Sequence, residues 1–470
     1  MTNLHTIDFI IILIVIVLTL ATALFAAKKR NDASGEEAVA GRSVNHWLLA
    51  LSAGATANSG FVLTGAVGLG YAYGLVWLLL PIGWFIGDII FWIFIAQKIN
   101  DISRESETVT LSSFIVFYAD NKQYINVIRM LISGLLVLLL SLYLSSQWLS
   151  IGKIINYIFD VDIVYFALSF GLIVAAYTSF SGIRGAIYTE ALQAVFMLIF
   201  VFFLIFYSIG IYLNDAMSPS TATLPQNFLS LNGDLTWWQT ILFVSGFSAL
   251  SIGFNVGQPQ MAVRWMSAKE DAIKKARWIY IAFVQFTFFT FILLGVFIKL
   301  SIDGLEDPEQ GLVAFVKQAS IPGFLGLFIA SAIATIASTG SALLATCGEI
   351  IRVDIFEKPK QKKVLFLATA FVSIISFIVV YFSKSNVYTL AITAVEFIGS
   401  SFAASVIYII LFKKISSFSI ISSVIIGFAC NAIWKYFDYD NIINGALPSI
   451  VLSFIAIWIY ESLNNKGKTK

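Results

Sequence analysis

The sequence has few charged residues, histidines and cysteines for its length. Of its 470 residues, 12% are charged, against about 25% in soluble domains, and 59% are hydrophobic. The two histidines, His5 and His46, lie near the ends of apolar runs, which argues against a histidine metal site or general base. Cys347 and Cys430 lie inside apolar runs, so no disulfide framework is expected. This composition predicts a polytopic membrane protein.

Long apolar runs alternate with short polar segments along the chain. A helix that crosses a bilayer needs about 20 apolar residues. No basic segment precedes the first run and no small-residue cleavage site follows it, so we expect a membrane span there rather than a signal peptide. The runs predict thirteen transmembrane helices, at about residues 7–27, 46–71, 74–97, 126–158, 162–181, 185–213, 237–256, 277–300, 322–352, 363–383, 387–412, 418–437 and 443–463.

The polar segments between the runs differ in their content of lysine and arginine. When alternate segments are grouped, one group holds 24 of the 29 basic residues and the other holds five. Cytoplasmic loops carry the excess of basic residues. We therefore expect a multi-pass protein of the cell (inner) membrane, with its N-terminus outside and its C-terminus in the cytoplasm.

The longest predicted outside loop, residues 214–236, separates two blocks of five helices. Because five is odd, the two blocks cross the membrane in opposite senses, which permits an inverted repeat. The predicted fold is an all-α polytopic membrane protein of about 13 helices. Its expected parts are an extra N-terminal helix and basic loop at 1–40, a first repeat at 41–213, the outside loop at 214–236, a second repeat at 237–415, and two extra C-terminal helices with a short cytoplasmic tail at 416–470.

Two predicted helices contain small polar residues and glycines at their centres. One carries Ser52-Ala-Gly-Ala-Thr-Ala-Asn-Ser-Gly60, and the other runs through Ser331 to Cys347. Hydrocarbon supplies no hydrogen-bond partners, so irregular backbone at membrane depth is tolerated only where it lines a site or cavity. Paired interrupted helices therefore indicate the binding site of a secondary transporter. Close helix packing through small residues is the alternative, and composition leaves it open.

The hydroxyl groups of the second segment suit a sodium ion. Hard cations prefer oxygen ligands. Ser338 and Thr339 can direct two hydroxyls at one point, with the carbonyl of Thr335 one turn earlier. Carbonyl groups at a break in the first segment, near Ala55 and Asn58, could complete the coordination.

Four acidic residues lie within predicted helices, where an acid costs about 2.5–3.5 kcal/mol and is a functional candidate by default. Glu349 lies close to Arg352, so we expect an ion pair at the membrane edge. Glu190 is either a rim residue or a second cation ligand. Asp88 and Glu396 lie deeper, and each either binds substrate or ion or satisfies a neighbouring helix.

Four stretches, in order along residues 40 to 355, resemble one family. Gly257-Gln-Pro-Gln-Met-Ala-Val-Arg-Trp-Met266 is similar to Gly-Gln-Pro-His-Ile-Leu-Ala-Arg-Phe-Met of the bacterial sodium/proline permeases, a branch of the sodium:solute symporter family. The other three resemble that family's first, fifth and eighth core helices. They are Gly41-Arg-Ser43 with Ala50-Leu-Ser-Ala-Gly-Ala55, Tyr177 through Gln193, and Ser331 through Thr339.

The resemblance implies a five-plus-five inverted repeat with one extra helix before it and two after it. It also implies a sodium site between the first and eighth core helices, formed by the carbonyls of Ala55, Asn58 and Thr335 and the hydroxyls of Ser338 and Thr339.

Some members of the family bind a second sodium ion through an acid on the fifth core helix. That position is Glu190 here rather than the usual Asp, with Ser338 and Ser341 opposite. A further hydroxyl position of the family is Ala342 in this chain, which weakens the expectation of a second ion.

The substrate pocket departs from the proline permeases. Their Asp in the first core helix is Ala57 here, and the Trp and Tyr that precede Gly-Gln-Pro are Ser251 and Asn255. Tyr143 matches a substrate-side Tyr of the family, and a buried Tyr needs a partner for its hydroxyl. We expect a rebuilt and more polar pocket, for which proline is not the favoured solute. The candidate substrate residues are Ser59, Val62, Tyr143, Ser251 and Asn255.

These observations predict a sodium-coupled symporter that imports a small polar organic solute, of amino acid, carboxylate or sugar type, by alternating access. Its expected partners are Na+, that solute and the lipid bilayer, with no nucleic acid and no obligate protein partner. A proton-coupled transporter of the same fold, using Glu190 or Glu396, is one alternative. A transporter-like membrane sensor is another, although the chain ends soon after its last span. No nucleotide loop is present, so an enzyme is not expected.

Overall fold

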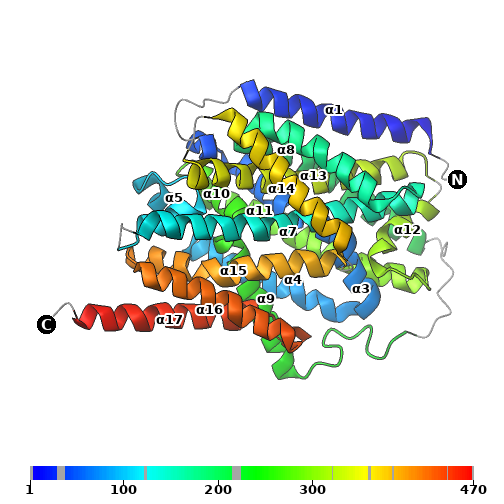
Figure 1. Cartoon of the computed structure of the whole chain (residues 1–470). Coiled ribbons are helices and arrows are strands. Elements are labelled where there is room, and N and C mark those ends of the chain that lie inside the picture. Colours follow the sequence, from blue (N-terminus) through cyan, green and yellow to red (C-terminus); the bar gives the residue numbers. More distant parts are fainter. Residues whose placement is uncertain are drawn as a thin grey trace.

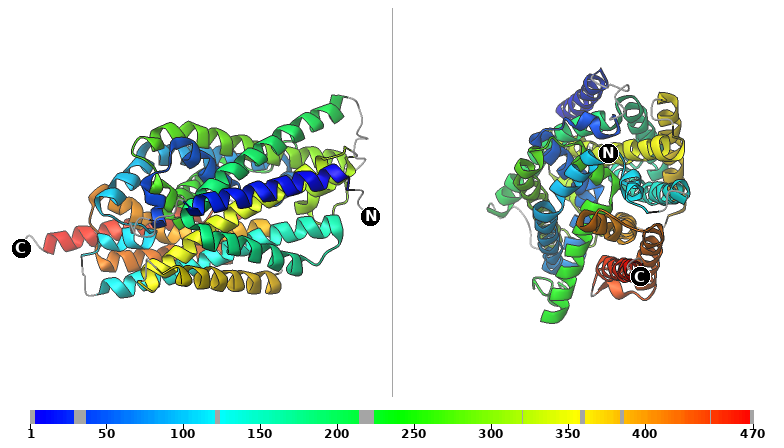
Figure 2. Two further views of the ribbon diagram at one scale, coloured as in Figure 1. Left: turned by 90° about the horizontal axis from the view of Figure 1, so that it is seen from above. Right: turned by 90° about the vertical axis from the view of Figure 1, so that its left-hand side faces the viewer.

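The chain is helical throughout the part that the structure describes. The computed structural model describes residues 4–467 except 29–36, 121–123, 214–223, 320, 358–360, 384, 385 and 442. Within these residues the only extended pairings are two isolated bridges, Val44 with Ala268 and Ala119 with Ile415. Most of the helices run roughly along one common axis (Figures 1 and 2). The prediction of an all-α polytopic fold is confirmed, as expected for a chain that must satisfy its backbone inside hydrocarbon.

The long helices correspond to the thirteen predicted spans. Eleven described stretches are long and apolar enough to cross a membrane, and two of them, with 60 and 51 residues, are long enough to cross twice. Thirteen crossings result. The helices are α1 Thr6–Lys28, α2 His46–Phe61 with α3 Val67–Tyr73, α4 Leu79–Phe94, α7 Ile125–Phe159, α8 Ile163–Leu213 (two crossings), α9 Trp237–Gly257, α11 Ala272–Ser301, α13 Phe324–Ile350, α14 Lys362–Phe382, α15 Val387–Phe412, α16 Ser417–Tyr436 and α17 Ala446–Gly467.

Shorter elements connect these crossings. The short α-helices are α5 Ala96–Glu105, α6 Leu111–Phe117, α10 Pro259–Ser267 and α12 Gly311–Gln318. The 3-10 and π turns are η2 Glu37–Arg42, η3 Val62–Ala66, η4 Gly74–Leu78, η6 Pro308–Gln310, η7 Ile351–Ile355 and η8 Tyr439–Asn441.

The helix α8 turns back on itself at Gly182, which is why it crosses twice. Gly182 has φ 61° and ψ −160°, a conformation that is open almost only to glycine. Arg184, just beyond this turn, donates a hydrogen bond of 2.8 Å to the carbonyl of Ala40, before α2 begins. Ile163 at one end of α8 packs against α7 near its C-terminal end, and Tyr207 near the other end packs against the first turn of α13. The turn and the two ends therefore lie at opposite faces of the bundle.

Two other crossings contain irregular backbone, one near its middle and one at its end. The helix α2 breaks at Ser59, which has φ 49° and ψ −177°, and continues through the π turn η3. The helix α9 ends at Gly257, and Gln258 is extended before α10 starts at Pro259.

The break in α2 lies in the first segment that the sequence singles out. The prediction that the second segment, Ser331 to Cys347, is also interrupted is wrong, because α13 is continuous from Phe324 to Ile350 and its hydroxyls bond back to carbonyls of the preceding turn. The second break instead follows α9, at Gln258.

Three crossings form the periphery. In α13 the central membrane window is 89% buried, whereas the corresponding values are 22% for α1 and 28% for both α16 and α17. Figure 1 shows α1 along one edge of the bundle and α16 with α17 along the opposite edge. The window in α8 is also 28% buried, so the expected division, with one extra helix before a ten-helix core and two after it, stays a prediction. Residues 214–223 of the expected outside loop lie outside the described part of the chain.

The Gly182 turn yields a test of the fold. We expect Gly182→Ala to lower the melting temperature, because a side chain in this backbone conformation costs about 1–3 kcal/mol. Gly134→Ala on α7 is the matched control, since a Cβ there meets nothing within 4 Å and alanine favours a helix. Thermal unfolding of both variants checks this. Equal melting temperatures for Gly182→Ala and the wild type would contradict the assigned turn.

Candidate functional site

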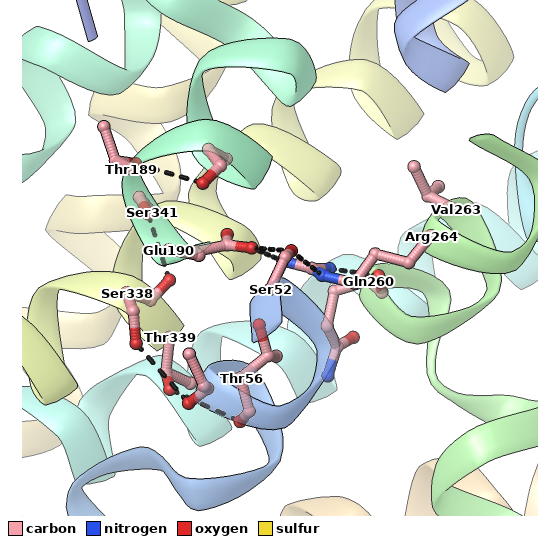
Figure 3. Close-up of polar contacts among 12 residues, drawn as sticks. Ser52, Thr56, Thr189, Glu190, Gln260, Val263, Arg264, Ser338, Thr339 and Ser341 are labelled. Atoms are coloured by element: carbon pink, nitrogen blue, oxygen red, sulfur yellow. Dashed lines mark hydrogen bonds and ion pairs between the residues drawn. The ribbon is translucent and has the colours of Figure 1, made fainter. Parts of the chain in front are cut away.

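The hydroxyls of α13 face the backbone of α2 just before its break. The Ser338 Oγ donates to the Thr335 carbonyl at 2.7 Å and lies 3.4 Å from the carbonyl oxygen of Ala55. The Thr339 Oγ1 lies 3.4 Å from the carbonyl oxygen of Thr56. Figure 3 shows these two side chains pointing from α13 toward α2. Four of the five predicted sodium ligands are thus adjacent, and the carbonyl of Thr56, which the sequence analysis did not include, joins them.

Neutral oxygens dominate this region, and not all of them have partners. All the hydroxyl side chains named above are at most 1% exposed. Among them, the Oγ1 atoms of Thr56 and Thr335 have no hydrogen-bond partner. Carbonyl and hydroxyl oxygens without partners are the ligand type that a hard monovalent cation accepts. The residues present therefore fit a sodium ion.

Asn58, the fifth predicted ligand, holds the break in place. Its side-chain nitrogen donates to the carbonyl of Gly54 at 2.9 Å, and its Oδ1 accepts from the Oγ1 of Thr287 on α11 at 2.5 Å. Its own carbonyl accepts the backbone N–H of Val62. The structure therefore places Asn58 at the break, but its oxygens already take part in hydrogen bonds.

The backbone that the break exposes is satisfied from α7. The N–H of Gly60 donates to the Oε1 of Gln147 at 2.8 Å. The Gly60 carbonyl accepts from Thr64 at 2.9 Å and from Ser150 at 3.3 Å. Side chains of a neighbouring helix thus replace the missing helical bonds, as irregular backbone at membrane depth requires.

Glu190 contacts an arginine rather than the hydroxyls predicted for a second sodium ion. Its carboxylate accepts a 2.5 Å hydrogen bond from the Nη2 of Arg264 on α10 and another from the Ser52 hydroxyl. The Nε of Arg264 also donates to Ser52 at 2.9 Å. Ser341 instead donates to the carbonyl of Ser338 at 3.0 Å. Figure 3 shows Glu190 directed toward Ser52 and Arg264.

Arg264 is one of the 24 basic residues that the sequence assigns to cytoplasmic segments, but it is not a loop residue. It lies within α10 and is 3% exposed. Its place in the stretch from Gly257 to Met266, beyond a break, was the available signal. The expected ion pair between Glu349 and Arg352 is confirmed, with Nε to Oε2 at 2.9 Å.

The predicted substrate residues divide into two groups. Ser59 and Tyr143 line a small cavity of about 20 Å³ beside the break, together with Trp84. Ser251 and Asn255 on α9 instead donate to the carboxylate of Asp88 on α4, each at 2.9 Å. Val62 is fully buried and does not line this cavity. A cavity this small holds no organic solute, so solute binding requires the aromatic side chains around it to move.

A second, larger cavity of about 660 Å³ lies beyond the small one and is lined by the segment 225–235, η6, the start of α15 and the connection between α16 and α17. Phe61 lines the small cavity and Tyr388 lines the large one, and their rings pack 6.0 Å apart. Glu396 lies in the wall of the large cavity, paired with Lys435 and accepting from Asn444. The large volume is within the usual range for ligand sites.

A bundle of thirteen crossings, with two interrupted helices and a hydroxyl-rich helix against one break, defines a secondary transporter of the five-plus-five inverted-repeat class. The particular family follows from the sequence match: residues 38–427 match the model of the sodium:solute symporter family. The chain belongs to that family, and it is a membrane transporter rather than an enzyme.

Known relatives are similar over nearly the whole chain. The sodium/proline symporter of Staphylococcus aureus (strain bovine RF122 / ET3-1) is 24% identical, over 97% of this chain and 93% of the relative. A substrate-bound, outward-open Na+-coupled sialic acid symporter has a similar fold, with a TM-score of 0.78, 16% identity, and 97% and 98% of the two chains covered. The nucleobase-cation-symport-1 transporter MHP1 in a closed conformation gives a TM-score of 0.53 at 16% identity, with 90% of this chain and 94% of MHP1 covered.

The pair of Glu190 and Arg264 yields a quantitative test. Removing one partner of a buried ion pair leaves an uncompensated charge and costs about 3–5 kcal/mol. We therefore expect Glu190→Gln and Arg264→Gln each to lower the melting temperature strongly, and the double variant to lose far less than their sum. Thermal unfolding in a double-mutant cycle measures this coupling.

The exposed pair of Glu105 and Lys413, at 2.5 Å, is the matched control for that cycle. Both side chains are more than half exposed, so the coupling from Glu105→Gln and Lys413→Gln should be close to zero. Equal coupling in the two cycles would contradict a special role for the buried pair.

Proposed function

We propose that this protein is a sodium-coupled symporter that imports a small polar organic solute by alternating access. The observation that carries the proposal is the approach of Ser338 and Thr339 to the α2 carbonyls beside the break at Ser59. The proposed sodium ligands are the oxygens of Ala55, Thr56, Thr335, Ser338 and Thr339, with Asn58 holding the break.

Sodium bound there would draw α13 and α2 together. The distances of 3.4 Å from each hydroxyl to an α2 carbonyl are long for an O–H···O hydrogen bond. A shared cation attracts all of these oxygens at once and so shortens the separation of the two helices. Because Ser59 and Tyr143 lie directly beyond the break, this motion orders the solute cavity, which couples ion binding to solute binding.

Two closures separate the site from the two sides of the membrane. On one side the ring of Phe61 packs on Tyr388 between the small and large cavities. On the other side the Glu190–Arg264 pair connects α8 to α10, and Ser52 adds α2. We infer that the first closure faces outside and the second faces the cytoplasm, as the distribution of basic loop residues predicts.

The charge state of Glu190 bears on the number of ions. Arg264 already compensates its carboxylate, and Ser341 faces the Ser338 carbonyl, so this arrangement favours one sodium ion near Ser338 over a second one at Glu190. One charge gains about 2.3 kcal/mol per 100 mV, and a tenfold sodium gradient adds about 1.4 kcal/mol. Together these support roughly 500-fold accumulation of solute per ion.

The two proton-coupling candidates have basic partners. Glu190 pairs with Arg264 and Glu396 pairs with Lys435, so each carboxylate is compensated without a bound proton. This pairing favours sodium coupling over proton coupling through either residue. The proline and sialic acid of the named relatives are candidate solutes to be tested, together with other polar classes.

Transport by proteoliposomes tests the proposal. We expect one class from a panel of proline, serine, glucose, lactate and sialic acid to be accumulated under an inward sodium gradient and not in choline, because solute moves together with a sodium ion. Uptake of radiolabelled solute measures this for neutral and anionic solutes alike, since one sodium ion carried with a monoanion produces no current. Uptake of equal size in choline would contradict sodium coupling.

A hydroxyl in the cavity wall tests where the solute binds. The hydroxyl of Tyr143 lies beside Ser59 in the small cavity. Tyr143→Phe removes one hydrogen-bonding group there, so we expect about a tenfold rise in the solute KM with the sodium dependence unchanged. Tyr157→Phe, on the same helix at its exposed end, is the control and should leave the KM unchanged. A wild-type KM in Tyr143→Phe would place the solute elsewhere.

A further inference from the structure

Asp88 differs from the other three acids that the sequence places within membrane helices. Glu190, Glu349 and Glu396 each form an ion pair with an arginine or lysine. Asp88, in the middle of α4, is fully buried, and in the described part of the chain no ion pair includes it. Its compensation must therefore come from something other than a basic side chain.

The hydrogen bonds of Asp88 satisfy only one of its two oxygens. The Oδ1 accepts from the Ser251 hydroxyl and from the Asn255 Nδ2, both at 2.9 Å. The Oδ2 has no hydrogen-bond partner. An ionised carboxylate that is buried with no positive partner costs so much that such a group normally binds a cation or a proton.

Two further oxygens without partners lie beside it. The Oδ1 of Asn255 and the hydroxyl of Tyr280 on α11 are both fully buried and unpaired. The Tyr280 hydroxyl lies near Asp88, next to the side chain of Asn255 and next to the buried indole N–H of Trp84, which also has no hydrogen-bond partner. Three helices of the core, α4, α9 and α11, thus each contribute an unsatisfied oxygen to one region.

The surrounding packing limits what can bind. The ring of Tyr280 packs on Trp92 at 5.2 Å, and Trp92 packs on Trp265 at 4.9 Å. Neither cavity described above reaches Asp88, so the candidate ligands are the smallest ones, a proton or a bare monovalent ion.

We propose that Asp88, Asn255 and Tyr280 form a second monovalent-cation site, which holds a sodium ion or a proton and is separate from the region of Ser338. The proposal deepens the proposed function by adding a coupled positive charge, and it has its own test.

The charged and titratable groups on the elements packed against α4 are Tyr280, Lys274, Lys275, Arg277 and Lys299 of α11 and Lys98, Asp101, Arg104 and Glu105 of α5.

The test compares melting temperatures of the purified full-length wild type with Asp88→Asn, which keeps the side-chain shape. Sodium chloride is titrated against choline chloride at constant ionic strength, and pH is varied in choline alone. Asp8→Asn is the matched control, the same exchange of a buried acid at the start of α1, where both carboxylate oxygens accept backbone N–H groups at 2.7 Å. Its responses to sodium and pH should follow the wild type.

The two cation sources give different results. If the site holds sodium, the rise in melting temperature per tenfold sodium is about twice as large in the wild type as in Asp88→Asn, because each saturated site adds one equal increment. If it holds a proton, the melting temperature in choline falls as pH rises in the wild type and is much flatter in Asp88→Asn, because only the folded state retains that proton. Unchanged sodium and pH responses in Asp88→Asn would overturn the proposal.

The variant Ser338→Ala/Thr339→Ala separates this proposal from the proposed function. If it keeps the full sodium response while Asp88→Asn loses part, the site near Ser338 fails and the Asp88 site stands. The reverse result, with pH responses unchanged, overturns the Asp88 site alone.

If Asp88→Asn does not fold, Tyr280→Phe removes one of the three oxygens. It should then weaken the sodium response severalfold or reduce the pH response, and wild-type responses in Tyr280→Phe would overturn the proposal.

Discussion

The interruption of α2 at Ser59 is the constraint on which the rest of the structure depends. A broken helix inside hydrocarbon has backbone groups that must find partners, and here they come from two different directions. Gln147 and Ser150 of α7 bind the exposed groups of Gly60, while the hydroxyls of α13 approach the carbonyls before the break. The first set is complete without a ligand. The distances in the second set are long and hydroxyls there are left unpaired, which is why we propose an ion at that point.

The buried charges follow the same logic of local compensation. Arg264 neutralises Glu190 while connecting three helices on one side of the site, and Lys435 neutralises Glu396 in the wall of the large cavity. These pairs are expensive to break, so they hold a closed arrangement that only a favourable event elsewhere can open. Asp88 lacks such a partner, so it is the acid at which we propose that a mobile cation binds.

Much of the fold could be predicted from the sequence, because the bilayer imposes a length and a composition on every crossing. The run 387–412 matches α15 at both ends, and the run at 46–71 was correctly singled out for its break. The approach of Ser338 and Thr339 to α2 could be predicted, because both segments collect small polar residues inside apolar runs, whereas their role as sodium ligands stays a prediction. The surroundings of Arg264 and Asp88 could not be predicted from the sequence. For Arg264 the reason is that hydropathy treats a basic residue near a helix end as a loop charge. Nor does one sequence say which distant helix supplies a partner, so Ser251 and Asn255 were assigned to the solute although they bind Asp88.

The central claim is that one sodium ion joins α13 to the broken α2. Equilibrium binding of radioactive sodium to the purified protein measures it most directly, with Ser338→Ala/Thr339→Ala as the test and Thr346→Ala, a buried hydroxyl two turns further along α13, as the control. We expect saturable binding that potassium and choline do not displace, retained in the control and reduced by at least one ion per protein in the double variant. Full sodium binding by the double variant would contradict the account.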